Sequence, residues 1–156
     1  KLCLSCQTNL SQAQNMLRTI IDEVHEDFLL LNKNKTIVDA NKNVYQRLGV
    51  SKTDILDKPC WSTWGKANQS CADANLHCPF DTVLKTGHKA EALHSRTDSQ
   101  GHLQYFRIYI YPIKDNNGRI THLVEMRRDI TKRTFMEKKL QQSEKMAAIG
   151  ELSTFI

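Results

Sequence analysis

The sequence lacks the features that would mark a membrane protein or an enzyme. No apolar run approaches the roughly 20 residues of a membrane-spanning helix, and the first residues do not form a signal peptide. A glycine-rich phosphate-binding loop is missing, as is any Ser–His–Asp or Cys–His spacing suited to nucleophilic catalysis. We therefore expect no catalytic site within these residues, and ATP binding would belong to another domain.

The composition fits one domain with extensions at its ends. The 156 residues are 40% hydrophobic, which is enough for one ordinary core. The net charge of +5 comes from scattered basic residues, and the densest group is Arg127, Arg128, Lys132 and Arg133. Because this group falls where a strand would pass into a helix, we interpret it as a solvated junction and expect no nucleic-acid partner.

The five cysteines form two groups, Cys3 and Cys6 near the beginning and Cys60, Cys71 and Cys78 in the middle. An odd number in two separate groups is unlike the dense, paired framework of a small secreted domain. We expect a cytoplasmic, reducing location for this domain, with cysteines that are free, metal-bound or redox-active. Whether a parent protein is attached to a membrane is left open.

The first 24 residues carry a heptad pattern. Apolar or small residues recur at spacings of three and four, at Cys3, Cys6, Leu10, Ala13, Leu17, Ile20 and Val24. This pattern predicts a helix that pairs with its twin in a parallel homodimer. These heptad positions form the seam, the face of the helix that would contact its twin. Cys3 and Cys6 are both seam positions, which accounts for their spacing, and a zinc or redox role for the pair is the alternative.

The middle of the chain predicts an α+β fold. Short apolar strands alternate with turn signals, of which Asn117-Gly118 is the strongest. The expected strands are 27–32, 36–41, 89–97, 103–113 and 119–129. The expected short helices are 43–49, one beginning near Ser51, and 79–85. This order predicts a five-stranded antiparallel sheet with short helices on one face and long helices at both ends.

Several local motifs in this order resemble the PAS domain family, over about Glu23 to Arg133. They are Asp39-Ala40-Asn41, Leu48-Gly49-Val50-Ser51, Lys85-Thr86-Gly87, Pro112-Ile113-Lys114-Asp115 with Gly118, and Asp129-Ile130-Thr131. The resemblance implies a sensory domain whose closing Asp-Ile-Thr joins the sheet to an outgoing signalling helix. Asp129, Ile130 and Thr131 are therefore expected to relay the signal, with the Asp129 carboxylate forming a hydrogen bond across the junction.

The residues after 133 predict a long polar helix. Its segment Met146–Ser153 resembles the approach to the phospho-acceptor histidine of bacterial two-component sensor histidine kinases, and no histidine follows His122. We expect the chain to stop just before that phospho-acceptor. The resemblance implies a homodimer joined through its N- and C-terminal helices, with a response regulator as partner of the missing ATP-dependent kinase domains. The expected organisation is a dimerisation helix at 1–24, a PAS sensor domain at 25–132 and a signalling helix at 133–156.

The central cysteines carry the chemistry of the expected sensor. Cys60, Cys71 and Cys78 with His77 supply four soft ligands, enough for zinc or an iron–sulfur cluster. No Cys-x-x-Cys lies within this group, so a disulfide, a redox switch and inert thiols are alternatives. The PAS resemblance adds haem on His77 or His88 as a further alternative, and implies no flavin because the light-sensing cysteine motif is absent.

An organic ligand is the remaining type of signal, held in a pocket between the helices and the sheet. The expected lining is aromatic, although each residue also suits a plain core: Tyr45, Trp61, Trp64, Phe80 and Tyr109. The predicted function is a sensory module that detects a ligand, a redox change or a metal and controls autophosphorylation through a C-terminal coiled coil. The alternatives are a constitutive dimerisation module and a switch based on the cysteines alone.

Overall fold

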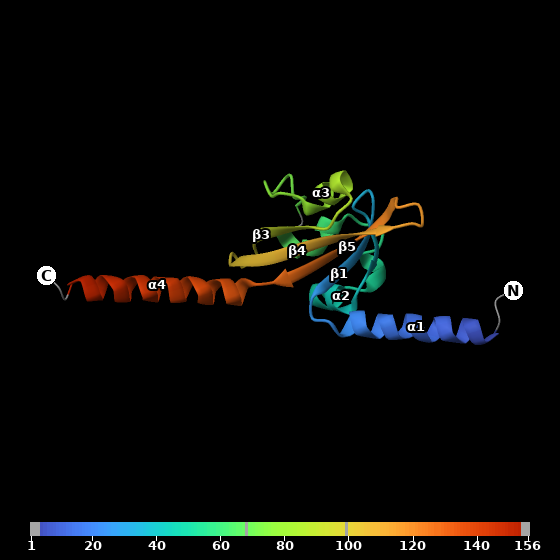
Figure 1. Cartoon of the computed structure of the whole chain (residues 1–156), viewed down its shortest axis with the longest axis horizontal. Helices are drawn as coiled ribbons and strands as arrows, with labels where there is room; N and C mark the ends of the chain where they lie inside the picture. Colours follow the sequence, from blue (N-terminus) through green and yellow to red (C-terminus); the bar gives the residue numbers. More distant parts are fainter. Residues whose placement is uncertain (1–3, 68, 99, 154–156) are drawn as a thin grey trace.

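A five-stranded antiparallel sheet forms the centre of the protein (Figure 1). The structure is a computed structural model that describes residues 4–67, 69–98 and 100–153, with side chains at all of these except 4, 5 and 65–67. The strands are β1 (Asp27–Asn32), β2 (Ile37–Ala40), β3 (Ala90–Thr97), β4 (Leu103–Lys114) and β5 (Ile120–Asp129). Their order is β2-β1-β5-β4-β3, so the first and last strands of the chain pair in the middle of the sheet.

Short helices connect β2 to β3, and local sequence sets their ends. They are α2 (Lys42–Leu48), the 3-10 helices η1 (Lys52–Asp54) and η2 (Cys60–Ala67), and α3 (Pro79–Thr86). Gly49 and Gly87 end α2 and α3 at φ values of 67° and 72°, a left-handed conformation that costs glycine little. Pro79 suits the start of α3, where a backbone amide has no helical partner to lose.

The hydrophobic core lies between these helices and one face of the sheet. Because alternate strand residues point to the same face, the strands contribute every second side chain. The buried apolar residues are Leu29, Leu31, Ile37, Ala40, Val44, Ile55, Phe80, Val83, Ile108, Ile110 and Leu123. The α+β fold class and the five-stranded antiparallel sheet predicted from the sequence are confirmed.

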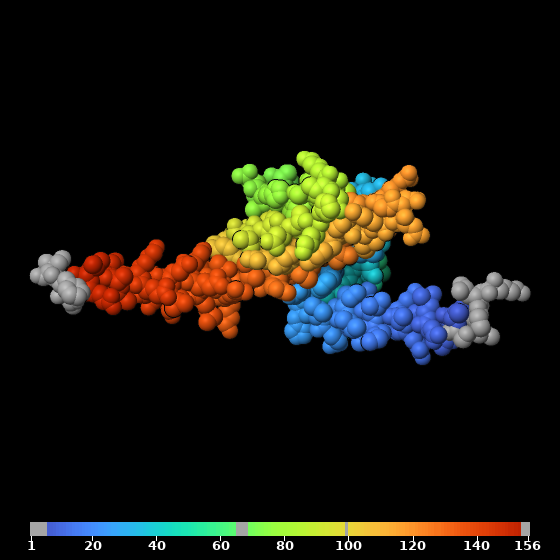
Figure 2. All heavy atoms as spheres, in the orientation of Figure 1, coloured from blue at the N-terminus to red at the C-terminus, as the bar shows by residue number. Residues whose placement is uncertain are grey.

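Two long helices flank the sheet domain (Figures 1 and 2). Helix α1 (Leu4–Glu23) is tied to β2 through Arg18, which forms an ion pair with Asp39 and donates to the Ala40 carbonyl. Helix α4 (Thr131–Ser153) follows β5 directly and extends away from the domain, with no buried side chain among its described residues. None of the helices in the described part of the chain has the length and apolar character needed to span a membrane.

Candidate functional site

The three central cysteines line one cavity beside α3. Cys60 is the first residue of η2, Cys71 lies in the turns that follow, and Cys78 immediately precedes α3. All three are half-buried free thiols. The cavity has a volume of about 460 Å³, and its other lining residues are Lys35, Trp61, Ser70, Ala72, Leu76, His77 and Asp81. Folding thus brings together thiols that are distant in the sequence.

Strand β3 anchors the loop that carries Cys71 and Cys78. The Nε2–H of His94 donates to the His77 carbonyl at 2.7 Å, and Nη1 of Arg96 donates to the Gln69 carbonyl at 3.3 Å. His94 and Arg96 are both buried and lie two residues apart, so both point to the inner face of the sheet. Sequence reasoning missed these anchors, and the alternation of β3 was the signal that could have found them.

The three thiols differ in how readily they ionise. Burial raises the pKa of Cys60 to about 12. A hydrogen bond between Cys71 and Cys78 raises the pKa of Cys71 and lowers that of Cys78, because it favours a proton on the first sulfur and a charge on the second. The backbone N–H of Asp81 and the Lys35 ammonium also lower the pKa of Cys78. Of the three thiols, Cys78 is therefore the one whose surroundings favour the thiolate.

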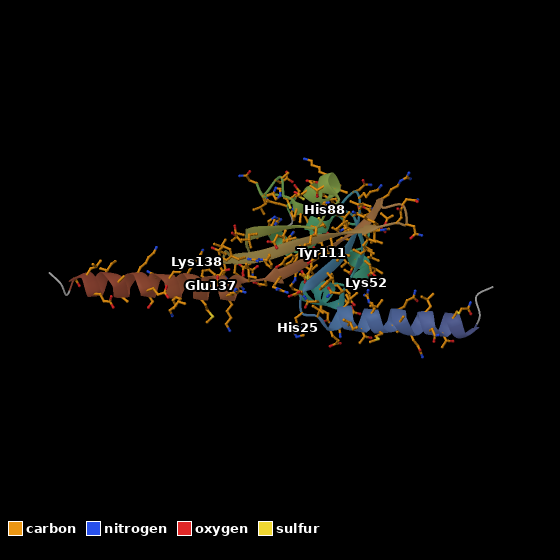
Figure 3. The ribbon with its side chains drawn as sticks, viewed as in Figure 1. His25, Lys52, His88, Tyr111, Glu137 and Lys138 are labelled. Atoms are coloured by element: carbon orange, nitrogen blue, oxygen red, sulfur yellow. The ribbon has the colours of Figure 1, made fainter. Side chains whose placement is uncertain are left out.

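The expected metal and haem ligands do not form a cluster in the described part of the structure. Within the described residues, no three His, Cys, Asp or Glu side chains gather closely enough to hold a metal ion. His77, the expected fourth ligand, is exposed, and its Nε2 forms a hydrogen bond with the Thr82 hydroxyl at 3.2 Å. His88, the other expected haem ligand, is exposed between α3 and β3 (Figure 3). Metal and haem binding stay predictions.

A buried ion pair on the last strand, β5, contacts a residue that lines the cysteine cavity. Arg127 is only 3% exposed and forms an ion pair with Glu125. Its guanidinium also donates to the Thr63 hydroxyl at 2.6 Å and to the Cys60 carbonyl at 2.9 Å. The prediction that Arg127 belongs to a solvated basic group is wrong, because the alternation of β5 points this side chain into the core.

Four of the five aromatic residues expected in one pocket lie on the helical side of the sheet. Phe80 is buried in the hydrophobic core, and Tyr45 and Trp64 pack against that core. Trp61 instead lines the cysteine cavity. These side chains therefore fill or border the space in which a ligand pocket was expected.

The fifth aromatic residue, Tyr109, does not join them. It alternates along β4 with the buried residues Ile108 and Ile110, so its ring lies on the opposite face of the sheet. There it stacks with Tyr111, whose position is labelled in Figure 3, at a centroid distance of 6.4 Å. The prediction of a single aromatic pocket is corrected for Tyr109, since strand alternation separates it from the others.

Strand β5 passes into α4 through the three residues expected to relay a signal. The Asp129 carboxylate accepts a hydrogen bond from the Thr131 N–H at 2.8 Å, which satisfies one free amide at the start of the helix. The N–H of Ile130 donates to the Tyr105 carbonyl at 2.9 Å, and the N–H of Tyr105 donates to Thr131 Oγ1 at 2.9 Å. The junction is therefore hydrogen-bonded to β4 as well as to β5.

Tyr105 is a further anchor of α4 that sequence reasoning missed. Its ring meets that of Phe135 edge-on at 5.8 Å, and Lys138 Nζ forms a hydrogen bond with its hydroxyl at 2.7 Å. Glu137 and Lys138 lie where α4 leaves the sheet domain (Figure 3). The first turns of α4 thus rest on the beginning of β4, and a shift between β4 and β5 would reach the helix directly.

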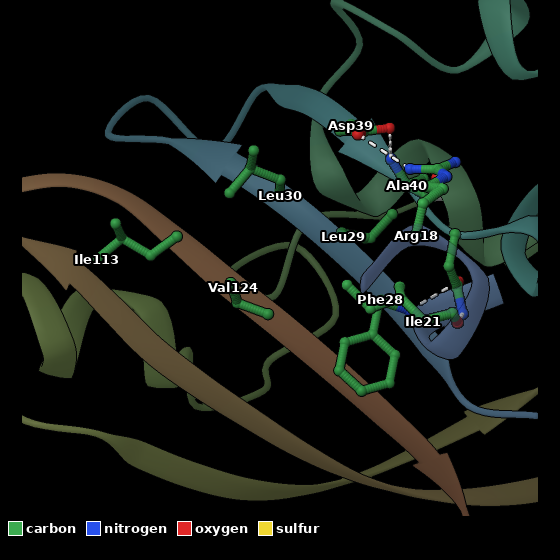
Figure 4. A pocket seen from close by; sticks show the side chains of 10 residues that line it. Arg18, Ile21, Phe28, Leu29, Leu30, Asp39, Ala40, Ile113 and Val124 are labelled. Carbon is green, nitrogen blue, oxygen red and sulfur yellow. Dashed lines mark hydrogen bonds and ion pairs between the residues drawn. The ribbon is translucent and has the colours of Figure 1, made fainter. Parts of the chain in front are cut away.

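An apolar groove lies where α1 meets the outer face of the sheet (Figure 4). It has a volume of about 260 Å³, and its lining includes Arg18, Ile21, Phe28, Leu30, Ile113 and Val124. The seam residues Leu10, Leu17 and Ile20 of α1 are 52–59% exposed, so within the described chain the predicted pairing surface stays accessible. Cys6 is exposed as well, whereas Cys3 lies outside the described residues.

Comparisons with known proteins agree with this architecture. A family model described as PAS domain matches residues 25–132. No match was found among curated proteins. Among solved structures, an RNA-binding light-oxygen-voltage receptor matches with a TM-score of 0.64 and 16% identity. The match covers 85% of this chain but only 37% of the receptor.

Two further similar structures come from Vibrio cholerae. A sensory box sensor histidine kinase matches with a TM-score of 0.53 and 14% identity, over 80% of this chain and 97% of that chain. The dimer of VqmA, a LuxR-type receptor, matches with a TM-score of 0.60 and 18% identity, over 76% of this chain and 52% of that chain. Identities this low show the fold alone. With the family match over residues 25–132, this chain belongs to the PAS domain family.

Proposed function

We propose that this chain is the sensory PAS module of a sensor histidine kinase and passes its signal through α4 to a kinase domain. The observation that carries the proposal is the direct passage of β5 into α4, hydrogen-bonded at Asp129 and Thr131. No flexible linker separates the sheet from the helix, so a movement of the sheet alters the position of the helix. The segment Met146–Ser153, which resembles the approach to a phospho-acceptor histidine, lies in the same helix.

The exposed apolar side chains of α4 support pairing with the same helix of a second copy. They are 49–69% exposed: Phe135, Met136, Leu140, Met146, Ile149 and Leu152. A helix that kept these side chains in water would be only marginally stable, and pairing along the face that carries Met136 and Leu140 would cover part of them. Ser143, Ala147 and Gly150 continue the heptad spacing of Met136 and Leu140 with small or polar residues. They weaken this seam of α4 locally, which suits a helix pair that shifts between two arrangements.

Helix α1 supports the same dimer at the other end of the domain. Arg18 and Asp22 fasten one side of α1 to the sheet domain, because Arg18 pairs with Asp39 and Asp22 accepts the Lys42 N–H at 2.9 Å. The heptad seam of α1 remains exposed on the helix. We propose that both helices pair with their twins, and that the sheet between them sets the arrangement of the α4 pair.

The test is a chimera in which residues 1–153 are joined to the dimerisation and catalytic domains of a sensor histidine kinase. One to seven residues are inserted within α4, and autophosphorylation from ATP is measured for each length. Because a coiled coil repeats every seven residues, we expect activity to fall for intermediate insertions and to return at seven. A steady decline with length, or no dependence on length, would contradict the helical relay.

Point variants in the same chimera test the junction. Asp129→Ala and Thr131→Val remove the two hydrogen bonds that tie α4 to the sheet. We expect the autophosphorylation of both variants to stay at one level, without the dependence on insertion length in α4 that the parent chimera shows. Lys132→Ala is the matched control, since Lys132 is exposed in the same turn of α4. Equal behaviour of all three variants would refute a relay through the junction.

A further inference from the structure

One thiol of the cysteine cavity is placed to react with a small molecule. Cys78 directly precedes α3, whose first-turn amides carry positive partial charge. The Lys35 ammonium, which forms an ion pair with Asp81 at 2.9 Å, also interacts with the Cys78 sulfur. The backbone N–H of Asp81, in the first turn of α3, also favours the charged form of the sulfur. These groups favour a negative charge on the sulfur of Cys78, which lines the cavity.

A second thiol is placed to complete the reaction. Cys71 forms a hydrogen bond with the Cys78 sulfur. The residues between them fold back in tight turns, in which the Leu76 N–H donates to the Cys71 carbonyl at 2.7 Å and the Asn75 N–H donates to the Ala72 carbonyl at 3.0 Å. Cys60 lines the same cavity, but burial keeps it protonated. The three thiols thus differ: Cys78 is the one favoured as the thiolate, Cys71 is next to it, and Cys60 stays protonated.

We propose that Cys78 and Cys71 are the attacking and resolving thiols of a hydroperoxide sensor. The Cys78 thiolate attacks the terminal oxygen of the hydroperoxide, so that an S–O bond forms and the O–O bond breaks. The leaving oxygen takes up a proton from water, and the sulfur, oxidised by two electrons, becomes a sulfenic acid. The Cys71 sulfur then attacks Cys78, an S–S bond forms, and the S–O bond breaks. The departing hydroxide leaves as water with the proton of Cys71.

The disulfide would act on parts of the fold that lead to α4. One sulfur belongs to a loop that His94 and Arg96 hold to β3, and the other belongs to Cys78, the residue that directly precedes α3. The same cavity meets β5 where Arg127 holds the Cys60 carbonyl. A disulfide that closes the loop between Cys71 and Cys78 would alter the contacts that His94, Arg96 and Arg127 make with this loop and with Cys60. This effect on signalling rests on the function proposed above, whereas the thiol chemistry itself does not.

The chemistry is tested on the purified chain. The reduced protein is treated with stoichiometric hydrogen peroxide, blocked with N-ethylmaleimide and mapped by peptide mass spectrometry. We expect a disulfide between Cys71 and Cys78. In Cys71→Ser, dimedone should instead trap a sulfenic acid on Cys78. Cys78→Ser should abolish both products, and Cys60→Ser is the matched control that should leave the disulfide unchanged. The thermal unfolding of each variant shows that it is folded.

A rate measurement separates a prepared thiolate from a merely accessible thiol. At pH 7, iodoacetamide should alkylate Cys78 at least about tenfold faster than Cys60, and Lys35→Met should slow the reaction of Cys78. Equal alkylation rates, a peroxide-induced disulfide that requires Cys60, or one stoichiometric metal ion bound by the reduced cysteines would each overturn the proposal.

The failure of this proposal can be told apart from failure of the kinase relay. If the Cys71–Cys78 disulfide forms but peroxide does not change autophosphorylation of the chimera, the thiol pair stands and its coupling to the kinase is refuted. If the chimera keeps its seven-residue periodicity while no disulfide forms, the relay stands and the hydroperoxide sensor is refuted.

Discussion

Arg127→Met removes the cation of the buried pair on β5. The Arg127 side chain is 1% exposed and that of Glu125 is 7% exposed, so the two charges are almost fully shielded from water. The guanidinium also lies over the Trp64 ring, with its central carbon 4.2 Å from the ring centroid. Methionine keeps most of the length and apolar contact of arginine. The substitution therefore isolates the loss of charge and of hydrogen bonds.

The expected loss in the free energy of unfolding comes from the Glu125 carboxylate, which remains buried after Arg127 is replaced. Breaking a buried ion pair by removing one partner costs about 3–5 kcal/mol, because the other charge stays buried. The buried Arg96 still interacts with Glu125, so we expect the lower end of this range. A domain has roughly 5–15 kcal/mol of total stability, so the variant should fold with a small margin. With a urea dependence of about 2 kcal/mol per molar, the unfolding midpoint should fall by roughly 2 M.

Urea unfolding of four proteins gives a double-mutant cycle: wild type, Arg127→Met, Glu125→Gln and the double variant. Because Glu125→Gln removes the charge that has lost its ion-pair partner, the double variant should be about 1–2 kcal/mol more stable than Arg127→Met alone. Arg128→Met is the control. The neighbouring Arg128 is exposed and pairs with Glu26 at the surface, so its loss should change stability by about 0.5 kcal/mol at most. A loss below about 1 kcal/mol for Arg127→Met, or additive effects in the cycle, would refute the reasoning.

Three further predictions concern His94, the junction and the α1 seam. Burial lowers the pKa of His94 below its ordinary value of 6.5. The neutral buried ring therefore contributes to the free energy of unfolding above about pH 6.5. This contribution is lost as the pH falls, because the ring binds a proton more readily in the unfolded chain. Urea unfolding at pH 7.5 and 5.5 should show a smaller loss of stability for His94→Gln than for wild type, by up to about 1.4 kcal/mol per pH unit; equal losses would contradict burial of the neutral ring. Asp129→Ala should lower the unfolding free energy by about 1 kcal/mol and speed amide exchange in the first turn of α4, and unchanged exchange there would refute the capping role. Leu17→Glu on the α1 seam should weaken the homodimer at least about tenfold in sedimentation equilibrium, whereas Gln12→Glu, which lies off the seam, should not; equal effects would exclude pairing through this seam.

Most elements of the fold were predictable because their signals are local. Strand β1 has the expected bounds, Asp27–Asn32, and Gly49 and Gly87 end α2 and α3 as expected. Helix α4 begins at Thr131 and not at 134, because the Asp129 carboxylate caps an amide that sequence periodicity does not reveal. Local chemistry therefore placed the elements to within a few residues.

The composition of the site was less predictable. The sequence singled out Cys60, Cys71 and Cys78, but it left metal binding, disulfide formation and inert thiols equally open. Arg127 was assigned to a solvated group, and Tyr109 was placed with aromatic residues that lie on the other face of the sheet. Both errors have one cause: a residue's face in a strand depends on which of two alternating sets meets the core.

The sequence by itself determined the α+β order, the turns, the heptad pattern of α1 and the motifs of the PAS family, because each of these depends on residues a few positions apart. Only the tertiary structure decided that Cys71, Cys78 and Lys35 line one cavity, and that Arg127 links Cys60 to β5. These contacts join residues from β1–β2, the helical segment and β5. Their proximity is set by packing across the sheet, which no local pattern encodes.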